Sequence, residues 1–273
     1  MIVIVFPYFS GMKRIVYSTF VLFLIWMISC TDPTEQTEDS VHTDSLAYQI
    51  KTMARTWNQC SPDSVNCTYI QFYYPVFKDL KSPLADSIQA LIAHSFDIKS
   101  GTEQKLDSAQ KGFICEFEES IKGEETSKIP WNLISSLSIA GQNASWICFK
   151  ESSGGYTGGA HDFGNSQYHI LEKSTGKHLH LVIFFDSTGL KKLTRLGESA
   201  FCKVRGIGPG QSLEEAGFKF EDNRFFLPEN FCFTKEGITF VFNSYEVGPY
   251  ALGPTEFAIP ANQLVNLMKK RKA

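Results

Sequence analysis

The sequence lacks several short motifs that mark common catalytic and cofactor sites. No two cysteines are separated by two residues, which gives the thioredoxin-like and zinc-ribbon classes no support. There is no Gly-x-Ser-x-Gly sequence, and no Gly-Lys-Ser or Gly-Lys-Thr follows a glycine-rich segment. These gaps argue against a serine hydrolase and a P-loop nucleotide site. We therefore expect no catalytic residue, no metal and no cofactor.

Basic residues are also too few for a protein that binds nucleic acid. The chain has 26 Lys and Arg against 29 Asp and Glu, a formal net charge of −3. Removal of residues 1–30 would take away Lys13 and Arg14 and no acidic residue, which changes the net charge to −5. Nucleic-acid binding requires clustered positive charge, so we exclude this partner.

The N-terminal apolar run is too short to span a bilayer. Residues 15–29 follow the basic pair Lys13-Arg14 and end at Ser29-Cys30, whereas a transmembrane helix needs about 20 apolar residues. A basic start, an apolar core and a small residue at the end are typical of a signal peptide. The cysteine after the small residue resembles the lipobox of bacterial lipoproteins, which predicts a signal peptide over residues 1–30 and a lipid on Cys30. An uncleaved membrane anchor is the alternative, and Met12 is the more natural start codon than Met1.

The residues after Cys30 predict a tether and then a folded body outside the cytoplasm. Residues 31–47 are acidic, rich in Thr and Ser and almost free of apolar side chains, so they cannot offset the entropy of ordering. We expect a flexible tether over residues 31–58, anchored to a membrane by the lipid on its periplasmic or surface side.

The remaining sequence predicts an α+β fold with helices packed on antiparallel sheets. Phe is common, at 23 residues, and short β-branched and aromatic runs alternate with amphipathic segments. Helices are expected over residues 82–96, 102–121, 189–204 and 261–270. Strands are expected over residues 69–77, 131–140, 144–153, 167–173, 178–185, 231–234, 238–243 and 256–260. This order favours two small mixed α/β subdomains over a doubly wound sheet.

Six cysteines remain if Cys30 is lipidated, and an even number in an exported domain suggests disulfides. These candidates are Cys60, Cys67, Cys115, Cys148, Cys202 and Cys232. The bond between Cys60 and Cys67 is the first expectation because it closes a short loop. Pairing of Cys202 with Cys232 and of Cys115 with Cys148 is a further expectation, although six cysteines allow 15 pairings. Buried free thiols are the alternative for each pair.

Two segments are richer in Gly, Pro and Tyr than regular structure requires, residues 154–161 and residues 243–254. The first contains Tyr156-Thr157-Gly158-Gly159-Ala160-His161. The second runs from Phe242 to Tyr250 and includes Gly253. Together they resemble the ectodomain family shared by the lysozyme-binding anti-sigma factor RsiV and the peptidoglycan deacetylase PdaC. That family has a Y-T-G-G-A-H turn and an F-x-P-Y-E-I-x-P-Y-x-x-G stretch, and here Ser244 replaces the first proline of the stretch.

The resemblance implies a PdaC-like N-terminal subdomain over residues 59–165 and an RsiV-like C-terminal subdomain over residues 166–273. It also implies an extracytoplasmic module that grips lysozyme or a peptidoglycan fragment. The chain departs from both relatives, since at most 14 residues precede the apolar run and no deacetylase pattern of Asp and His is visible. We therefore expect neither anti-sigma activity nor deacetylase activity of this chain.

The two segments supply the predicted binding residues. Tyr side chains offer a large, rigid contact area with a hydroxyl group, which suits the recognition of proteins and sugars. The expected ligand contacts are Tyr156, His161, Tyr245, Glu246, Pro249 and Tyr250. One alternative is a cell-envelope hydrolase that uses His161, Asp162 and Glu246. Another is a purely structural envelope lipoprotein, in which His161 and Glu246 only satisfy backbone groups of their loops.

Overall fold

The computed structural model describes residues 45–122 and 129–269. The predicted signal peptide, Cys30 and the first part of the predicted tether lie outside these residues. Residues 42–273 form one compact unit that contains two hydrophobic cores and two disulfides. We therefore expect this unit to fold by itself. None of the helices in the described ranges is both long and apolar enough to cross a bilayer.

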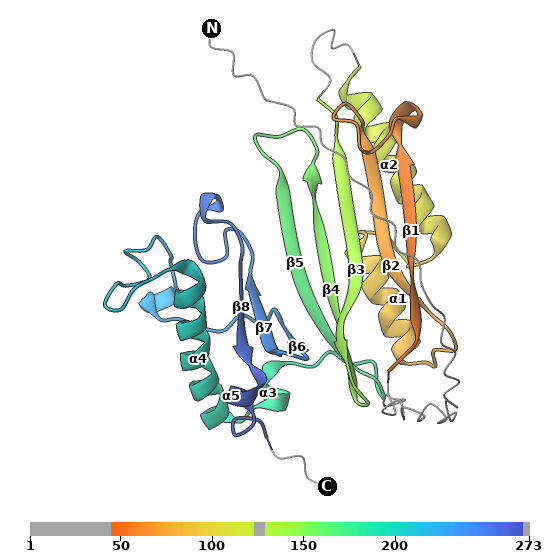
Figure 1. The fold of residues 1–273 in the computed structure, drawn as a ribbon. Coiled ribbons are helices and arrows are strands. Elements are labelled where there is room, and N and C mark those ends of the chain that lie inside the picture. The colour runs from red at the N-terminus through yellow and green to blue at the C-terminus, as the bar shows by residue number, and fades with distance from the viewer. Residues whose placement is uncertain (1–44, 123–128, 270–273) are drawn as a thin grey trace, which may run out of the picture. The chain divides into compact units, whose positions relative to one another are not determined.

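A five-stranded sheet forms the first half of the described chain (Figure 1). Its strands lie in the order of the sequence, β1-β2-β3-β4-β5, and only β2 and β3 are parallel. The strands are β1 (Tyr48–Thr56), β2 (Tyr69–Phe77), β3 (Asn132–Gln142), β4 (Trp146–Tyr156) and β5 (Phe163–Glu172). The α+β prediction is confirmed, but this sheet is mixed because two helices connect β2 to β3, and such a crossover returns the chain in a parallel direction.

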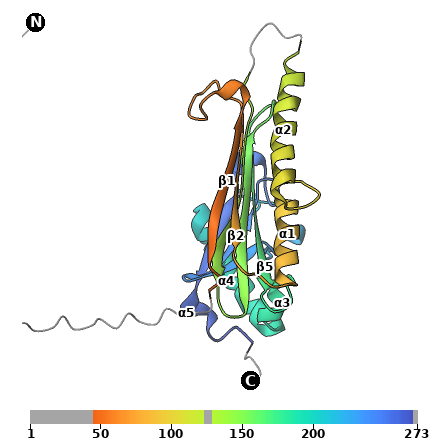
Figure 2. The same cartoon turned by 90° about the vertical axis from the view of Figure 1, so that its right-hand side faces the viewer.

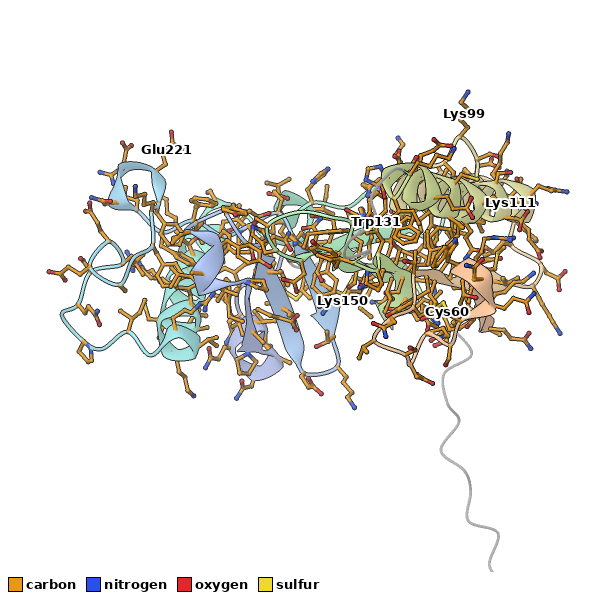
Figure 3. The ribbon with its side chains drawn as sticks, turned by 90° about the horizontal axis from the view of Figure 1, so that it is seen from above. Cys60, Lys99, Lys111, Trp131, Lys150 and Glu221 are labelled. Atoms are coloured by element: carbon orange, nitrogen blue, oxygen red, sulfur yellow. A yellow bond between two sulfur atoms is a disulfide. The ribbon has the colours of Figure 1, made fainter. Side chains whose placement is uncertain are left out.

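Helices α1 (Leu84–Ser95) and α2 (Glu103–Ser120) cover one face of this sheet (Figure 2). Their apolar stripes explain the placement, since residues three and four apart share one side of a helix. Ile88, Ile92, Leu106 and Phe113 pack against inward-facing residues of β2 to β4, whereas Lys111 points away from the sheet (Figure 3). Both helices were predicted to within three residues at each end.

The second half builds a smaller antiparallel sheet with its own core. It consists of β6 (Phe231–Thr234), β7 (Gly237–Phe242) and β8 (Thr255–Pro260), with the short helices α3 (Leu181–Phe184) and α5 (Ala261–Leu264) nearby. Helix α4 (Ser187–Arg205) packs on β8 and begins where the Asp186 side chain accepts a hydrogen bond from the Gly189 amide at 2.7 Å. Fully buried Phe201 of α4 lies within 6 Å of five other Phe rings. This aromatic core explains the high Phe content.

Four sequence predictions are wrong in part. The expected tether over residues 31–58 contains β1, which pairs along its whole length with β2. The expected boundary at residue 165 falls inside β5, which belongs to the first sheet throughout. Residues 178–185 form two isolated bridges, at His178 and Phe185, with α3 between them instead of a strand, and the last helix ends at Leu264. In the first two cases pairing with the neighbouring strand decides the structure, and the local sequence does not show it.

The disulfide pattern is confirmed for one pair and wrong for two. Cys60 and Cys67 are bonded, with Cα atoms 5.5 Å apart. The second bond joins Cys148 to Cys232, with Cα atoms 6.2 Å apart, and both Cys115 and Cys202 are free.

Cys148 bonds to Cys232 and not to Cys115 because successive side chains of β4 point to opposite faces of the sheet. Ile147 and Phe149 face the helices, so Cys148 points to the opposite side of the sheet, toward β6. Cys115 belongs to α2, which covers the opposite face of the sheet from Cys148, and its side chain is exposed. The second disulfide therefore joins the two sheets.

Removing this second disulfide should cost more than removing either free thiol. We expect Cys148→Ala with Cys232→Ala to lower the free energy of unfolding of residues 42–273 by about 2–5 kcal/mol, because the bond closes a loop of 84 residues. Cys115→Ala and Cys202→Ala should change it by less than about 1 kcal/mol. Urea unfolding measures both. A thiol titration of the unfolded, unreduced protein that finds a number other than two would contradict the pattern.

Candidate functional site

The two motif segments, about 80 residues apart in sequence, meet in the structure. The Tyr250 hydroxyl donates to the backbone carbonyl of Asp162 at 2.8 Å and lies 3.1 Å from its carboxylate. The His161 ring stacks on the Tyr250 ring with centroids 4.0 Å apart and planes at 23°. The two segments are thus in direct contact.

The first segment is the turn between β4 and β5. Gly158 has φ +83°, and a Cβ atom there would lie 2.9 Å from the indole nitrogen of Trp131. Only glycine combines this backbone conformation with this close approach. The Tyr156 hydroxyl then closes the turn by donating to the Gly159 carbonyl at 3.0 Å, and His161 Nδ1 lies 2.6 Å from the Asp162 carbonyl.

The second segment is held in place from α4. Arg205, in the last turn of α4, donates to the carbonyls of Leu252 at 2.8 Å and Gly253 at 2.9 Å and to the hydroxyl of Thr255 at 2.7 Å. These bonds fix the single 3₁₀ turn Tyr250–Leu252 that carries the Tyr250 ring. A charged fork donating to several carbonyls gives more geometric control than one neutral bond.

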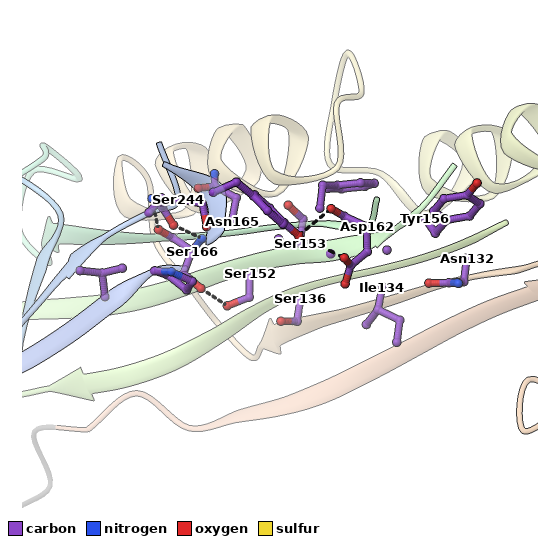
Figure 4. A pocket seen from close by; sticks show the side chains of 18 of the residues that line it. Asn132, Ile134, Ser136, Ser152, Ser153, Tyr156, Asp162, Asn165, Ser166 and Ser244 are labelled. Carbon is purple, nitrogen blue, oxygen red and sulfur yellow. Dashed lines mark hydrogen bonds between the residues drawn. The ribbon is translucent and has the colours of Figure 1, made fainter. Parts of the chain in front are cut away.

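A groove of about 780 Å³ lies where this contact meets the sheet face opposite α1 and α2 (Figure 4). Its floor comes from alternate residues of β3, β4 and β5, including Ser136, Ser152 and Ser166, because side chains two apart on a strand share a face. Hydroxyl and amide groups dominate the lining. The polar and aromatic lining residues are Asn132, Ser136, Ser152, Ser153, Tyr156, Asp162, Phe163, Asn165, Ser166, Asn243, Ser244, Tyr250 and Glu256. No Lys, Arg or His belongs to the lining within the described ranges.

Some of the predicted binding residues line the groove and others lie outside it. Tyr156 and Tyr250 line the groove. Tyr245 is 66% exposed and lies beside Tyr250, with ring centroids 5.6 Å apart, but outside the lining. Exposed Pro249 directly precedes the 3₁₀ turn and lies outside the lining. The serines and asparagines of the floor were not predicted; their signal was the placement of small polar residues at alternate positions of strands.

Glu246, one member of the alternative hydrolase group, is held by hydrogen bonds from Asn243. The Glu246 carboxylate accepts hydrogen bonds from the backbone amide of Asn243 at 2.9 Å and from its side-chain amide at 3.2 Å. Within the described chain, no hydrogen bond or ion pair joins Glu246 to His161 or Asp162. No cluster of three or more His, Cys, Asp or Glu that could hold a metal occurs among the described residues either.

Two asparagines cover the free edge of β5. Asn243 accepts from the Ser166 amide at 2.8 Å and donates to the Ser166 carbonyl at 3.0 Å. Asn230 accepts from the Tyr168 amide at 2.8 Å and also donates to the Ser166 carbonyl, at 2.7 Å. Both side chains are at least 90% buried. Their amides replace a sixth strand at this edge and attach it to the segments around β6 and β7.

Two ionisable side chains near the groove, Lys150 and Tyr250, have shifted pKa values. Lys150 of β4 pairs with Glu256 of β8 at 2.9 Å. Burial works to lower the pKa of Lys150, but the hydrogen bond to Glu256 and the nearby Tyr168 raise it overall, so the ammonium group stays charged. Partial desolvation and the Asp162 carboxylate raise the pKa of Tyr250, which keeps its hydroxyl protonated as a donor.

A row of histidines lies under the last turn of α1, away from the groove. The ring of His169 is 6.3 Å from that of His94 and 5.8 Å from that of His178, and its Nε2 is 2.8 Å from the Glu151 carboxylate. Burial, and then the neighbouring imidazoles, lower the pKa of His178. Burial acts to raise the pKa of Glu151, but the contact with His169 lowers it overall.

Loss of an edge asparagine should destabilise the fold. Asn243→Ala leaves the Ser166 amide without its partner in a partly buried site, so we expect the free energy of unfolding to fall by about 1–3 kcal/mol. The exposed neighbour Asn165 provides the control, and Asn165→Ala should change it by less than about 0.5 kcal/mol. Equal effects of the two substitutions, measured by urea unfolding, would refute the role of the edge asparagines.

Acid should weaken the fold in two steps. A His whose folded pKa is lowered stabilises the native state above its unfolded value of 6.5, and this contribution is lost as the pH falls below that value. Glu151, with a lowered folded pKa, adds a second loss below its unfolded value of 4.5. In His178→Gln, the first loss, measured by urea unfolding at pH 7.5 and pH 5.5, should shrink. The exposed His180→Gln should behave as wild type, and an unchanged pH dependence in His178→Gln would contradict this assignment.

Comparison with known proteins gives a family for the C-terminal part of the chain. Residues 183–262 match the family model described as "Protein of unknown function (DUF3298)". A crystal structure of a DUF3298 family member from Bacteroides fragilis has a TM-score of 0.63 at 20% identity, over 82% of this chain and 95% of that one. One from Pseudomonas aeruginosa has a TM-score of 0.59 at 15% identity, over 83% and 95%. No curated protein matches. The fold of both halves is therefore shared with these two structures, and residues 183–262, which contain α4 and the three-stranded sheet, match the DUF3298 family model.

Proposed function

We propose that this protein is an extracytoplasmic lipoprotein, anchored through a lipid on Cys30, whose folded part binds a cell-wall glycan without catalysing a reaction. The observation that carries the proposal is the contact of Tyr250 with Asp162, which closes one side of a groove lined by hydroxyl and amide groups together with the carboxylates of Asp162 and Glu256. The two disulfides support folding in an oxidising compartment outside the cytoplasm.

The chemistry of the groove suits a sugar chain. Each sugar unit presents several hydroxyl groups, which can exchange hydrogen bonds with Ser136, Ser152 and Asn165. The rings of Tyr156 and Tyr250 offer flat apolar surface with a hydroxyl at the edge, a combination that suits the face and rim of a sugar ring. The carboxylates of Asp162 and Glu256 in the lining disfavour an anionic ligand.

The arrangement favours binding over hydrolysis. A general acid or base must lie within hydrogen-bond reach of its partner group or of one bridging water. His161 Nδ1 lies 2.6 Å from the Asp162 carbonyl, and the Glu246 carboxylate accepts hydrogen bonds from the amides of Asn243. Neither side chain lines the groove.

A basic protein such as lysozyme is the second candidate ligand. The net charge of −5 expected for the mature chain, together with the Asp162 carboxylate in the lining, would attract a cationic partner. Exposed Tyr245 beside the groove offers a contact of the kind common in protein interfaces. The resemblance to the RsiV and PdaC ectodomains supports the same ligand.

Titration of residues 42–273 with a chitin oligosaccharide and, separately, with lysozyme tests both candidates by calorimetry. We expect the oligosaccharide to bind. Ser136→Trp, which places a large ring on the groove floor, should weaken binding at least about tenfold, equivalent to about 1.4 kcal/mol. Ser138→Trp is the matched control, because Ser138 shares the strand and the exposed face but lies outside the groove, and it should bind as wild type.

The outcomes separate the two ligands. Binding of lysozyme alone, weakened by Ser136→Trp but not by Ser138→Trp, would replace the glycan by a protein ligand at the same groove. Failure of both ligands to bind the folded protein would remove the proposed function.

A further inference from the structure

A second pocket lies on the other face of the five-stranded sheet. It has a volume of about 470 Å³ and opens between α1, α2 and the strands that they cover. Its buried wall consists of Ile70, Phe72, Phe96 and Phe113, all at most 9% exposed. This volume and this mainly apolar lining with a few polar groups are typical of pockets for small molecules.

Gly112 keeps this pocket open at a cost to α2. It stands in the middle of an 18-residue helix, where glycine destabilises by about 1 kcal/mol relative to alanine. No crowding explains it, because a Cβ atom added there would find no neighbouring heavy atom within 4 Å. The missing side chain therefore leaves empty space in the pocket wall. Any larger residue at position 112 would project into that space.

A buried hydroxyl in the same lining lacks a partner. The Ser95 side chain belongs to a residue that is 8% exposed, and its oxygen makes no hydrogen bond of ordinary geometry. It lies beside Glu151, and its contact with that carboxylate helps to lower the pKa of Glu151. An unsatisfied buried hydroxyl costs about 1–3 kcal/mol, and a ligand atom that accepts its proton would recover this loss.

The charges at the opening restrict the ligand. Exposed Asp97 and Glu116 belong to the lining, with exposed His94 beside them. Two carboxylates at the mouth repel an anionic head group. We propose that this pocket binds a small uncharged amphiphile, with an apolar ring system against Phe96 and Phe113 and a carbonyl or ether oxygen that accepts a hydrogen bond from Ser95. The pocket lies on the face of the sheet opposite the floor of the groove, and the two linings share Ser153 and Phe163.

Fluorescence titration of residues 42–273 with prodan tests this site, because prodan is an uncharged naphthalene ketone whose emission shifts to the blue in apolar surroundings. We expect saturable binding of one prodan per chain, and at least tenfold weaker binding of the anionic dye 1-anilinonaphthalene-8-sulfonate. Gly112→Leu should abolish prodan binding while the protein stays folded, since leucine favours the helix and fills the empty space. Ser95→Ala should weaken prodan binding about three- to tenfold.

Two control variants test whether prodan binds in this pocket and not elsewhere on the protein. Cys115→Leu adds the same side chain to the exposed side of α2, outside the pocket, and should leave prodan affinity unchanged. Ser136→Trp in the groove should also leave it unchanged, which separates this proposal from the glycan proposal. The inference is overturned if prodan shows no saturable binding, or if Gly112→Leu and Cys115→Leu bind it equally well.

Discussion

The covered edge of β5 is the constraint on which the rest of the structure depends. A sheet edge presents unpaired amides and carbonyls that must find partners when they are buried. Here Asn230 and Asn243 supply those partners from the second half of the chain. Because Asn243 is also the first residue of the second motif segment, the same bonds that satisfy the edge bring Tyr250 to Asp162. The groove is thus a consequence of how one strand edge is covered.

Strands β4 and β5 serve two purposes along their length. Near one end, Cys148 and Ile170 are buried in the core shared with the smaller sheet. Toward the other end, Ser152, Gly154 and Gly164 carry small side chains or none, and the space above them remains open as the groove. The change from large to small residues along a single pair of strands therefore decides where the halves pack and where a ligand has room. Beneath the helices, Gly112 and Ser95 create a comparable opening by the same means.

Local patterns in the sequence predicted the elements whose formation depends on local residues. The stripes of α1, α2 and α4 and the aromatic strand β2 were identified because burial repeats at the helical or strand period. Strand β1 and the start of β5 were missed because their sequences are polar and only their partners, β2 and β4, hold them extended. At the groove, Tyr156 and Tyr250 were identified from their motifs. The serines and asparagines of the floor come together only through the register of β3, β4 and β5, which the sequence does not specify.

The connection of Cys148 to Cys232 also bears on how the chain matures. A polypeptide that enters an oxidising compartment with its N-terminus first exposes Cys115 and Cys148 before Cys232 follows. Oxidation in order of appearance would join Cys60 to Cys67 correctly and then lock Cys115 to Cys148, a bond that would hold one side of β4 to the wrong face of the sheet. Correct maturation therefore requires either that α2 packs before Cys148 is oxidised or that a thiol-disulfide isomerase rearranges the early product.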